Sequence, residues 1–129
     1  MKPFHATEVP FQTADPRNFV GNARVKRLPV VEGDQPVTVY LVAFEPGGRT
    51  NWHTHSAPQV LLVTEGSGLV QKWGEPVRAI AAGEAITIEP NEKHWHGATA
   101  TTKMAHFAVN LNLTTHWLEP VSDEQYRAS

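Results

Sequence analysis

Short apolar runs, each ended by a glycine or proline turn, set the pattern of this 129-residue chain. The run Val37–Phe44 is rich in β-branched and aromatic residues, and it ends at the turn formed by residues 45–48. The run Pro58–Thr64 has the same character and ends at the turn of residues 65–68. Such runs predict strands, and many short strands with regular turns predict an antiparallel sandwich or barrel. The sequence therefore predicts an all-β fold.

Other segments extend the pattern. Further strands are predicted within 19–30 and over 69–73, 77–80, 84–88, 94–97 and 101–113. Residues 74–76 predict a hairpin turn, because glycine and proline favour turns between strands. A short helix is predicted near Ser122–Arg127, where Ser122 is a suitable N-cap. Residues 1–18 predict an N-terminal arm that covers an edge strand or a partner subunit, and residues 19–129 predict one barrel.

The composition excludes several classes of protein. With 40% hydrophobic and 19% charged residues, the chain can build a core. It has no cysteine, which excludes disulfide scaffolds and thiolate metal sites. A net charge of −2 without a basic stripe argues against nucleic acid as a partner. No apolar run is long enough to cross a membrane, and the N-terminal residues do not resemble a signal peptide. We expect a cytoplasmic protein whose partner is a small molecule.

Histidines are the most specific chemical signal. Five of the seven fall at His53, His55, His94, His96 and His106. Side chains two residues apart on a strand share a face, so each His-X-His pair points to one side of the sheet. Histidine is a good metal ligand and an unusual residue for a strand core. The two pairs therefore predict a divalent metal site, while His5 and His116 have no partners in this pattern.

The last predicted strand has two different faces. His106, Ala108 and Asn110 share the face that we expect to line a cavity. The alternating residues on the opposite face are all apolar: Phe107, Val109 and Leu111. We expect this face to pack against another sheet or a subunit. Together with the N-terminal arm, it predicts a homodimer or a higher homo-oligomer.

The spacing of glycines around the histidines resembles the cupin family. The first cupin motif is matched by Gly47, His53-Thr-His55, Gln59 and Gly66, with Gln59 in place of the usual glutamate. Residues 83–96 resemble the second motif, although the proline falls one residue late and Glu92 stands where glycine is common. This alignment leaves either His94 or His96 as the fourth ligand. The resemblance implies a single-domain jelly-roll β-barrel.

A closer resemblance narrows the expected function. Residues 53–59, 92–98, 101–106 and 123–127 resemble the bacterial manganese-dependent cupin hydroxynitrile lyases and the small cupins related to carboxymuconolactone decarboxylase proteins. This resemblance implies a metal held by His53, His55, Gln59 and His94. It also implies a pocket lined by Tyr40, Val42, His96, His106 and Asn110, to which we add Phe44 from the same strand face. Two positions depart from the pattern: Tyr40 replaces a small residue, and Asn110 replaces glutamine.

The expected ligands suggest a mechanism. Three neutral imidazoles and an amide leave the full +2 charge on the metal, so the site is a stronger Lewis acid than one containing glutamate. Nitrogen and oxygen donors fit Mn, Fe, Ni or Zn, and the resemblance selects Mn. The hypothesis is a lyase that cleaves or forms a small 2-hydroxynitrile or a related aldol-type substrate. Either His96 or His106 takes the hydroxyl proton, or both orient the ligands. Tyr40 either donates a hydrogen bond into the cavity or fills it.

Two other functions fit the same barrel. The first is a metal-dependent oxygenase acting on a small organic substrate. Gln59 argues mildly against this alternative, because oxygen-activating sites commonly use a carboxylate. The second is a non-catalytic module that binds a metal or a small molecule. Arg49 is expected to be a surface charge, or else to meet an anionic substrate at the barrel mouth.

Overall fold

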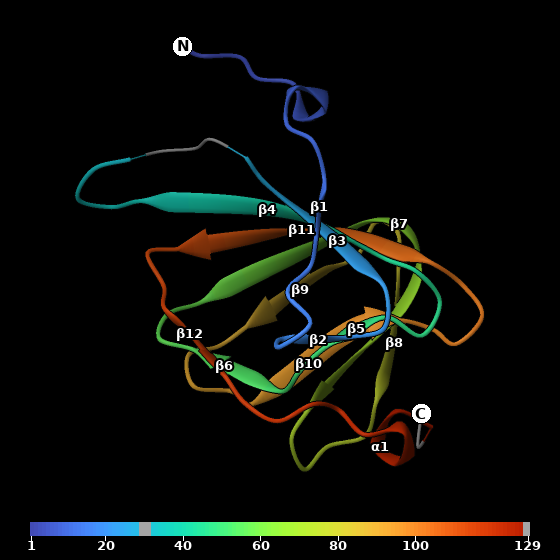
Figure 1. The fold of residues 1–129 in the computed structure, drawn as a ribbon. Helices are drawn as coiled ribbons and strands as arrows, with labels where there is room; N and C mark the ends of the chain where they lie inside the picture. The colour runs from blue at the N-terminus through green and yellow to red at the C-terminus, as the bar shows by residue number, and fades with distance from the viewer. Residues whose placement is uncertain (29–31, 128–129) are drawn as a thin grey trace.

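The computed structural model describes residues 1–28 and 32–127 and is almost entirely β-structure (Figure 1). The elements are η1 (Ala6–Glu8), β1 (Gln12–Thr13), β2 (Phe19–Val20), β3 (Ala23–Leu28), β4 (Val37–Phe44), β5 (Arg49–Thr50), β6 (His53–His55), β7 (Gln59–Lys72), β8 (Arg78–Ala81), β9 (Ala85–Ile88), β10 (His94–Ala98), β11 (Met104–Leu111), β12 (Thr115–Trp117) and α1 (Asp123–Arg127). The predicted all-β fold with a short C-terminal helix is confirmed. Within the described ranges, no helix has the length and apolarity to cross a membrane.

The strands form one curled antiparallel sheet with two halves. The first half has the order β1-β3-β4-β11-β7, with β9 also paired to β7. The second half has the order β7-β10-β5-β2, and β8, β6 and β12 complete it. Strand β7 belongs to both halves, because its first residues pair with β9 and its later residues pair with β8. This shared strand curls the sheet and sets the two halves opposite each other around a core.

Gly66 lies at the bend of β7. Its φ of 76° is a left-handed conformation that glycine adopts without strain, and an added Cβ would collide with the Lys103 carbonyl oxygen. The sequence pattern predicted two strands here, over 58–64 and 69–73, and that prediction was wrong. The turn-like residues 65–68 do not end the strand, because the ladder continues on both sides of the bend.

Three other boundaries differ from the expectations. The strand predicted within 19–30 is divided into β2 and β3, and residues 29 and 30 lie outside the described part of the chain. The strand predicted over 101–113 is confined to β11. A separate strand, β12, follows and pairs with β6, a contact that no local pattern predicted. The hairpin around residues 74–76 is confirmed by the pairing of β7 with β8.

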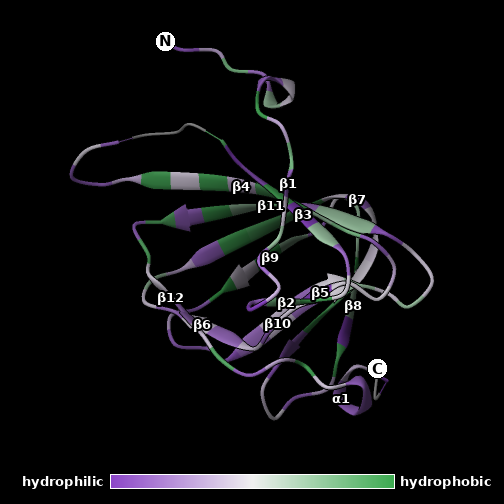
Figure 2. Ribbon diagram, viewed as in Figure 1, coloured by the Kyte–Doolittle hydropathy of each residue, from purple (hydrophilic) through white to green (hydrophobic). Residues whose placement is uncertain are grey.

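Two apolar clusters support the barrel. The larger lies inside it and includes Phe44, Leu61 and Met104, each at most 1% exposed. The smaller contains Trp52 and Trp95 beneath the C-terminal segment, together with Leu69, Val121 and Tyr126. The hydropathy colouring in Figure 2 contrasts the apolar strand β4 with the polar strands β6 and β10. The histidines of β6 and β10 are nevertheless buried, which sets these strands apart as the place for a site.

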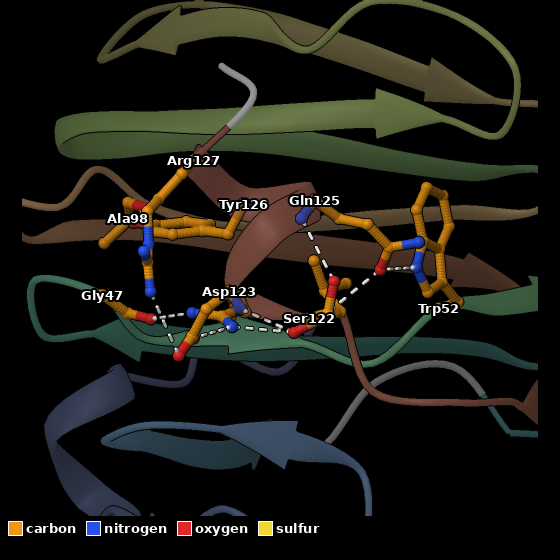
Figure 3. A network of polar contacts seen from close by, with 10 residues as sticks. Gly47, Trp52, Ala98, Ser122, Asp123, Gln125, Tyr126 and Arg127 are labelled. Carbon is orange, nitrogen blue, oxygen red and sulfur yellow. Dashed lines mark hydrogen bonds and ion pairs between the residues drawn. The ribbon is translucent and has the colours of Figure 1, made fainter.

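The C-terminal helix is fixed by polar contacts (Figure 3). As predicted, Ser122 caps it: the Gln125 backbone N–H donates to Ser122 Oγ at 3.1 Å. The Tyr126 hydroxyl donates to the Ala98 carbonyl oxygen at 2.6 Å. Arg49 is only 4% exposed, and its guanidinium donates to the Val121 carbonyl oxygen at 2.7 Å. The expectation that Arg49 is a surface or substrate-binding charge was wrong, because its side chain fastens this segment to the barrel.

Candidate metal centre

The ladder of strand β10 brings the two histidine pairs together. His94 on β10 stands directly opposite His53 on β6, and their ring centroids are 4.2 Å apart. The His55 ring lies 5.0 Å from the rings of both His53 and His94. The His96 ring lies 5.4 Å from that of His53. The four imidazoles therefore converge inside the barrel, as side chains on one sheet face must.

Two backbone carbonyls orient this cluster. The His53 Nδ1 lies 2.8 Å from the Asn51 carbonyl oxygen, and the His94 Nδ1 lies 2.8 Å from the Glu92 carbonyl oxygen. A carbonyl only accepts, so each Nδ1 carries the proton and each Nε2 keeps a free lone pair. This arrangement is typical of metal-binding histidines. Ring nitrogens of His53, His94 and His96 lie within 4.8 Å of one another, which is close enough to hold one ion.

Gln59 adds an oxygen to the same region. It begins β7, is 4% exposed, and its Oε1 has no hydrogen-bond partner. The Nε2 of His94, the Nε2 of His96 and the Nδ1 of His55 are likewise buried without a partner. An unpaired buried polar atom costs roughly 1–3 kcal/mol, so several in one place are unfavourable unless a ligand satisfies them. The donors are neutral nitrogen and oxygen atoms, which fit a divalent cation.

Burial keeps the imidazoles neutral. Desolvation lowers the pKa of His55, His94 and His106 to about 4. Desolvation, and secondarily repulsion from the neighbouring imidazoles, lowers the pKa of His53 and His96 well below its ordinary value. No described carboxylate lines the cavity to oppose these shifts. At neutral pH the cluster is therefore in the deprotonated form that binds a metal.

His106 on β11 lies behind His96. Its Nε2 is 2.9 Å from the His96 Nδ1, so one of these two nitrogens donates to the other. The Phe44 ring packs against both imidazoles, with centroids 6.1 Å from His96 and 5.6 Å from His106. The remaining nitrogen of His96, Nε2, is buried without a hydrogen-bond partner. His96 therefore links the histidine cluster to His106.

A cavity of about 480 Å³ opens beside the cluster. Its walls include the predicted residues Tyr40, Val42, His53, His55, Gln59, His96, His106 and Asn110. Phe44, which we assigned to the pocket, does not line it. That residue shares the inward face of β4 with Val42 but lies deeper, beneath the imidazoles, and is 1% exposed. His94 is also absent from the walls and is fully buried behind the cluster.

Two aromatic residues of the cavity were missed by the sequence analysis. The Trp117 ring packs against His53 at 4.7 Å and against Phe19 at 5.8 Å. The pairing of β12 with β6 places this tryptophan directly opposite His53. The short run of residues 115–117 has strand-forming character, yet nothing local indicates its pairing with β6. Phe19 carried no signal beyond its place in a predicted strand.

The chain is similar to known proteins over most of its length. Residues 40–110 match the family described as Cupin domain. An (R)-mandelonitrile lyase from Granulicella tundricola is 44% identical over 114 residues, which cover 84% of this chain and 86% of that protein. A crystal structure of a cupin-like protein from Thermotoga maritima superposes with a TM-score of 0.85 and 39% identity, covering 89% of this chain and 90% of the other.

A more distant likeness concerns the fold alone. The polyketide cyclase RemF from Streptomyces resistomycificus superposes with a TM-score of 0.72 at 19% identity, covering 98% of this chain and 91% of the other. The curled sheet, the converging histidines and these matches agree with the glycine and histidine spacing of the sequence. The chain belongs to the cupin family.

Proposed function

We propose that this protein is a metal-dependent lyase that cleaves a small 2-hydroxynitrile into an aldehyde and hydrogen cyanide, or catalyses the reverse reaction. The observation that carries the proposal is the cluster of buried neutral imidazoles at the wall of a cavity of about 480 Å³. The 44% identity to a protein named (R)-mandelonitrile lyase supports this reaction class over others available to the same fold.

The residues that would hold the metal are His53, His55, Gln59 and His94. Their unpaired buried atoms and lowered pKa values suit a divalent cation. We propose Mn as the native ion, with Fe, Ni and Zn as alternatives that the same donors accept. A ring nitrogen of His96 also lies near those of His53 and His94, but we assign His96 to the reaction and not to the metal. A cation bound there would supply a Lewis acid for the negative charge that develops during the reaction.

The chain's own contribution is a proton acceptor beside the cavity. With His96 donating its Nδ1 proton to His106 Nε2, the His96 Nε2 has a free lone pair for the substrate hydroxyl. As His96 takes the hydroxyl proton, the oxygen electron pair forms the aldehyde C=O bond. The C–C bond to the nitrile breaks, its electron pair leaves with cyanide, and the imidazolium returns the proton to give hydrogen cyanide.

The cavity walls suit an aromatic or aliphatic side group. Phe19, Val25 and Trp117 contribute apolar surface to the cavity walls. The volume of about 480 Å³ lies within the roughly 300–1,000 Å³ of typical small-molecule sites. Tyr40 narrows the cavity and is half-buried. We therefore propose mandelonitrile, whose phenyl group fits an apolar wall, as the probe for this activity.

The test compares metal-loaded with chelator-treated protein. Elemental analysis identifies the ion that accompanies protein purified without added metal. Mandelonitrile cleavage is then followed by benzaldehyde absorbance and by cyanide release. We expect cleavage that requires the metal and is lost in His94→Ala, with His116→Ala as the matched control outside the cluster. Cyanide release no faster from loaded than from stripped protein would reject the lyase, and oxygen consumption by the iron-loaded protein would favour an oxygenase.

A further inference from the structure

We propose that Asn110 is a positioning residue that fixes the Gln59 amide with its oxygen toward the histidine cluster. The two residues stand directly opposite each other in the ladder between β7 and β11. The Gln59 Nε2 donates to Asn110 Oδ1 at 2.7 Å. Among the described residues, no other hydrogen bond is made by the Gln59 side chain. The inference rests on the metal site of the proposed function.

The effect of this contact depends on the difference between the two ends of the Gln59 amide. The nitrogen end of a glutamine only donates, and its oxygen end only accepts. With the nitrogen held by Asn110, the oxygen is left buried and without a partner. A rotation of the amide by half a turn would present two N–H groups to the cation site, where they cannot bind a cation. One hydrogen bond thus selects the orientation in which Gln59 can be a ligand.

Asn110 can have this orienting role only because the residue opposite it is a glutamine and not a glutamate. A glutamate at this position would offer an oxygen in either orientation, so it would need no such partner. Gln59, in contrast, depends on an acceptor beside its nitrogen. Asn110 supplies that acceptor and also lines the cavity. Residues that orient a metal ligand in this way typically change metal affinity by about 10–100-fold when they are replaced.

The experiment measures Mn²⁺ affinity by calorimetric titration of metal-free protein. Asn110→Leu removes the acceptor, and we expect the affinity to fall about tenfold or more. Asn110→Asp keeps an oxygen acceptor in the same shape, and we expect it to keep the affinity. Thr38→Val is the matched control, because Thr38 stands opposite Asn110 on β4 and also lines the cavity but has no bond to Gln59.

A double-mutant cycle tests the orientation itself. In the Gln59→Glu background, Asn110→Leu should cost much less affinity than in the wild-type background, because a carboxylate has oxygen at both ends. Equal losses in the two backgrounds, or a loss in Asn110→Asp as large as in Asn110→Leu, would overturn the inference. So would an Asn110→Leu affinity equal to that of Thr38→Val. Wild-type protein that binds no Mn²⁺ would instead contradict the proposed metal site.

Discussion

His106 Nε2 and His96 Nδ1 lie 2.9 Å apart in the interior of the barrel, although their strands, β11 and β10, belong to opposite halves of the sheet and pair with β7 rather than with each other. The other nitrogen of His96, Nε2, has no hydrogen-bond partner, and His106 is fully buried. A proton that reaches His96 from the cavity can therefore be shared with an imidazole that no solvent contacts. Removing either ring breaks this pair.

We expect His96→Ala and His106→Ala each to lower kcat for mandelonitrile cleavage by about 10²–10⁴-fold, the usual contribution of general acid–base catalysis. Groups that act as a unit are not additive, so the double variant should be about as slow as the slower single variant. The measurement is cyanide release, with metal content determined beside it. His116→Ala, an exposed histidine, is the control. Full activity in both single variants would show that the pair takes no part in proton transfer.

The neutral histidine cluster makes the metal-free protein sensitive to acid. The pKa of His106 is about 4 in the folded state because of burial, against an ordinary value of 6.5. Between these values the unfolded chain binds protons that the folded chain does not, so the free energy of unfolding decreases as pH falls from 6.5 to 4. For His106 alone the loss is about 3 kcal/mol, since one pKa unit is 1.36 kcal/mol.

This prediction is checked by urea unfolding of the metal-free protein at pH 7.5 and at pH 4.5. We expect a lower midpoint at the acidic pH, and a smaller decrease for His106→Asn, which has no ionisable group to protonate. For each protein, the midpoint at pH 4.5 is compared with its own midpoint at pH 7.5. The destabilisation caused by the substitution itself therefore cancels. A midpoint that is the same at both pH values would contradict the buried, neutral state of the cluster.

Much of the barrel and of its histidine cluster could be predicted because both depend on local periodicity. The alternation of strand side chains is enough to place His53 with His55, and His94 with His96, on single faces. The contacts that escaped prediction depend on pairing between distant segments. The approach of Trp117 to His53 comes from the β6–β12 ladder, which joins two short strands without a connecting hairpin signal. The depth of Phe44 likewise depends on where β4 ends inside the barrel.

Tyr40 is expected to set the size of the substrate. It stands on the inward face of β4 and lines the cavity beside Val42. In Tyr40→Ala, the ratio of kcat/KM for a naphthyl cyanohydrin to that for mandelonitrile should rise about tenfold, because filled apolar space discriminates by about 1–3 kcal/mol. The larger ring of Tyr40→Trp should lower the same ratio. If each variant changed kcat/KM for the two substrates by the same factor, Tyr40 would not select substrates by size.

The short helix α1 makes both a buried hydrogen bond and a solvent-exposed ion pair, so the stabilities that the two contribute can be compared (Figure 3). The Tyr126 hydroxyl donates to the Ala98 carbonyl oxygen at 2.6 Å within the barrel wall, so Tyr126→Phe should reduce the free energy of unfolding by about 1–2 kcal/mol. The ion pair of Asp123 with Arg49 joins a 5% exposed side chain to one that is 70% exposed. Asp123→Asn should cost less than about 1 kcal/mol, because solvent screens the exposed partner.

Both variants are compared by urea unfolding at pH 7.5, well above the pKa of the Asp123 carboxyl, which the hydrogen bond from Arg49 lowers further. Arg49→Met is the third arm. It removes the charge but keeps the stem, and it leaves the Val121 carbonyl oxygen without its donor. We expect its loss of stability to exceed that of Asp123→Asn, since the buried contact rather than the exposed ion pair fastens the helix. The reverse order would show that the surface charge holds this end of the chain.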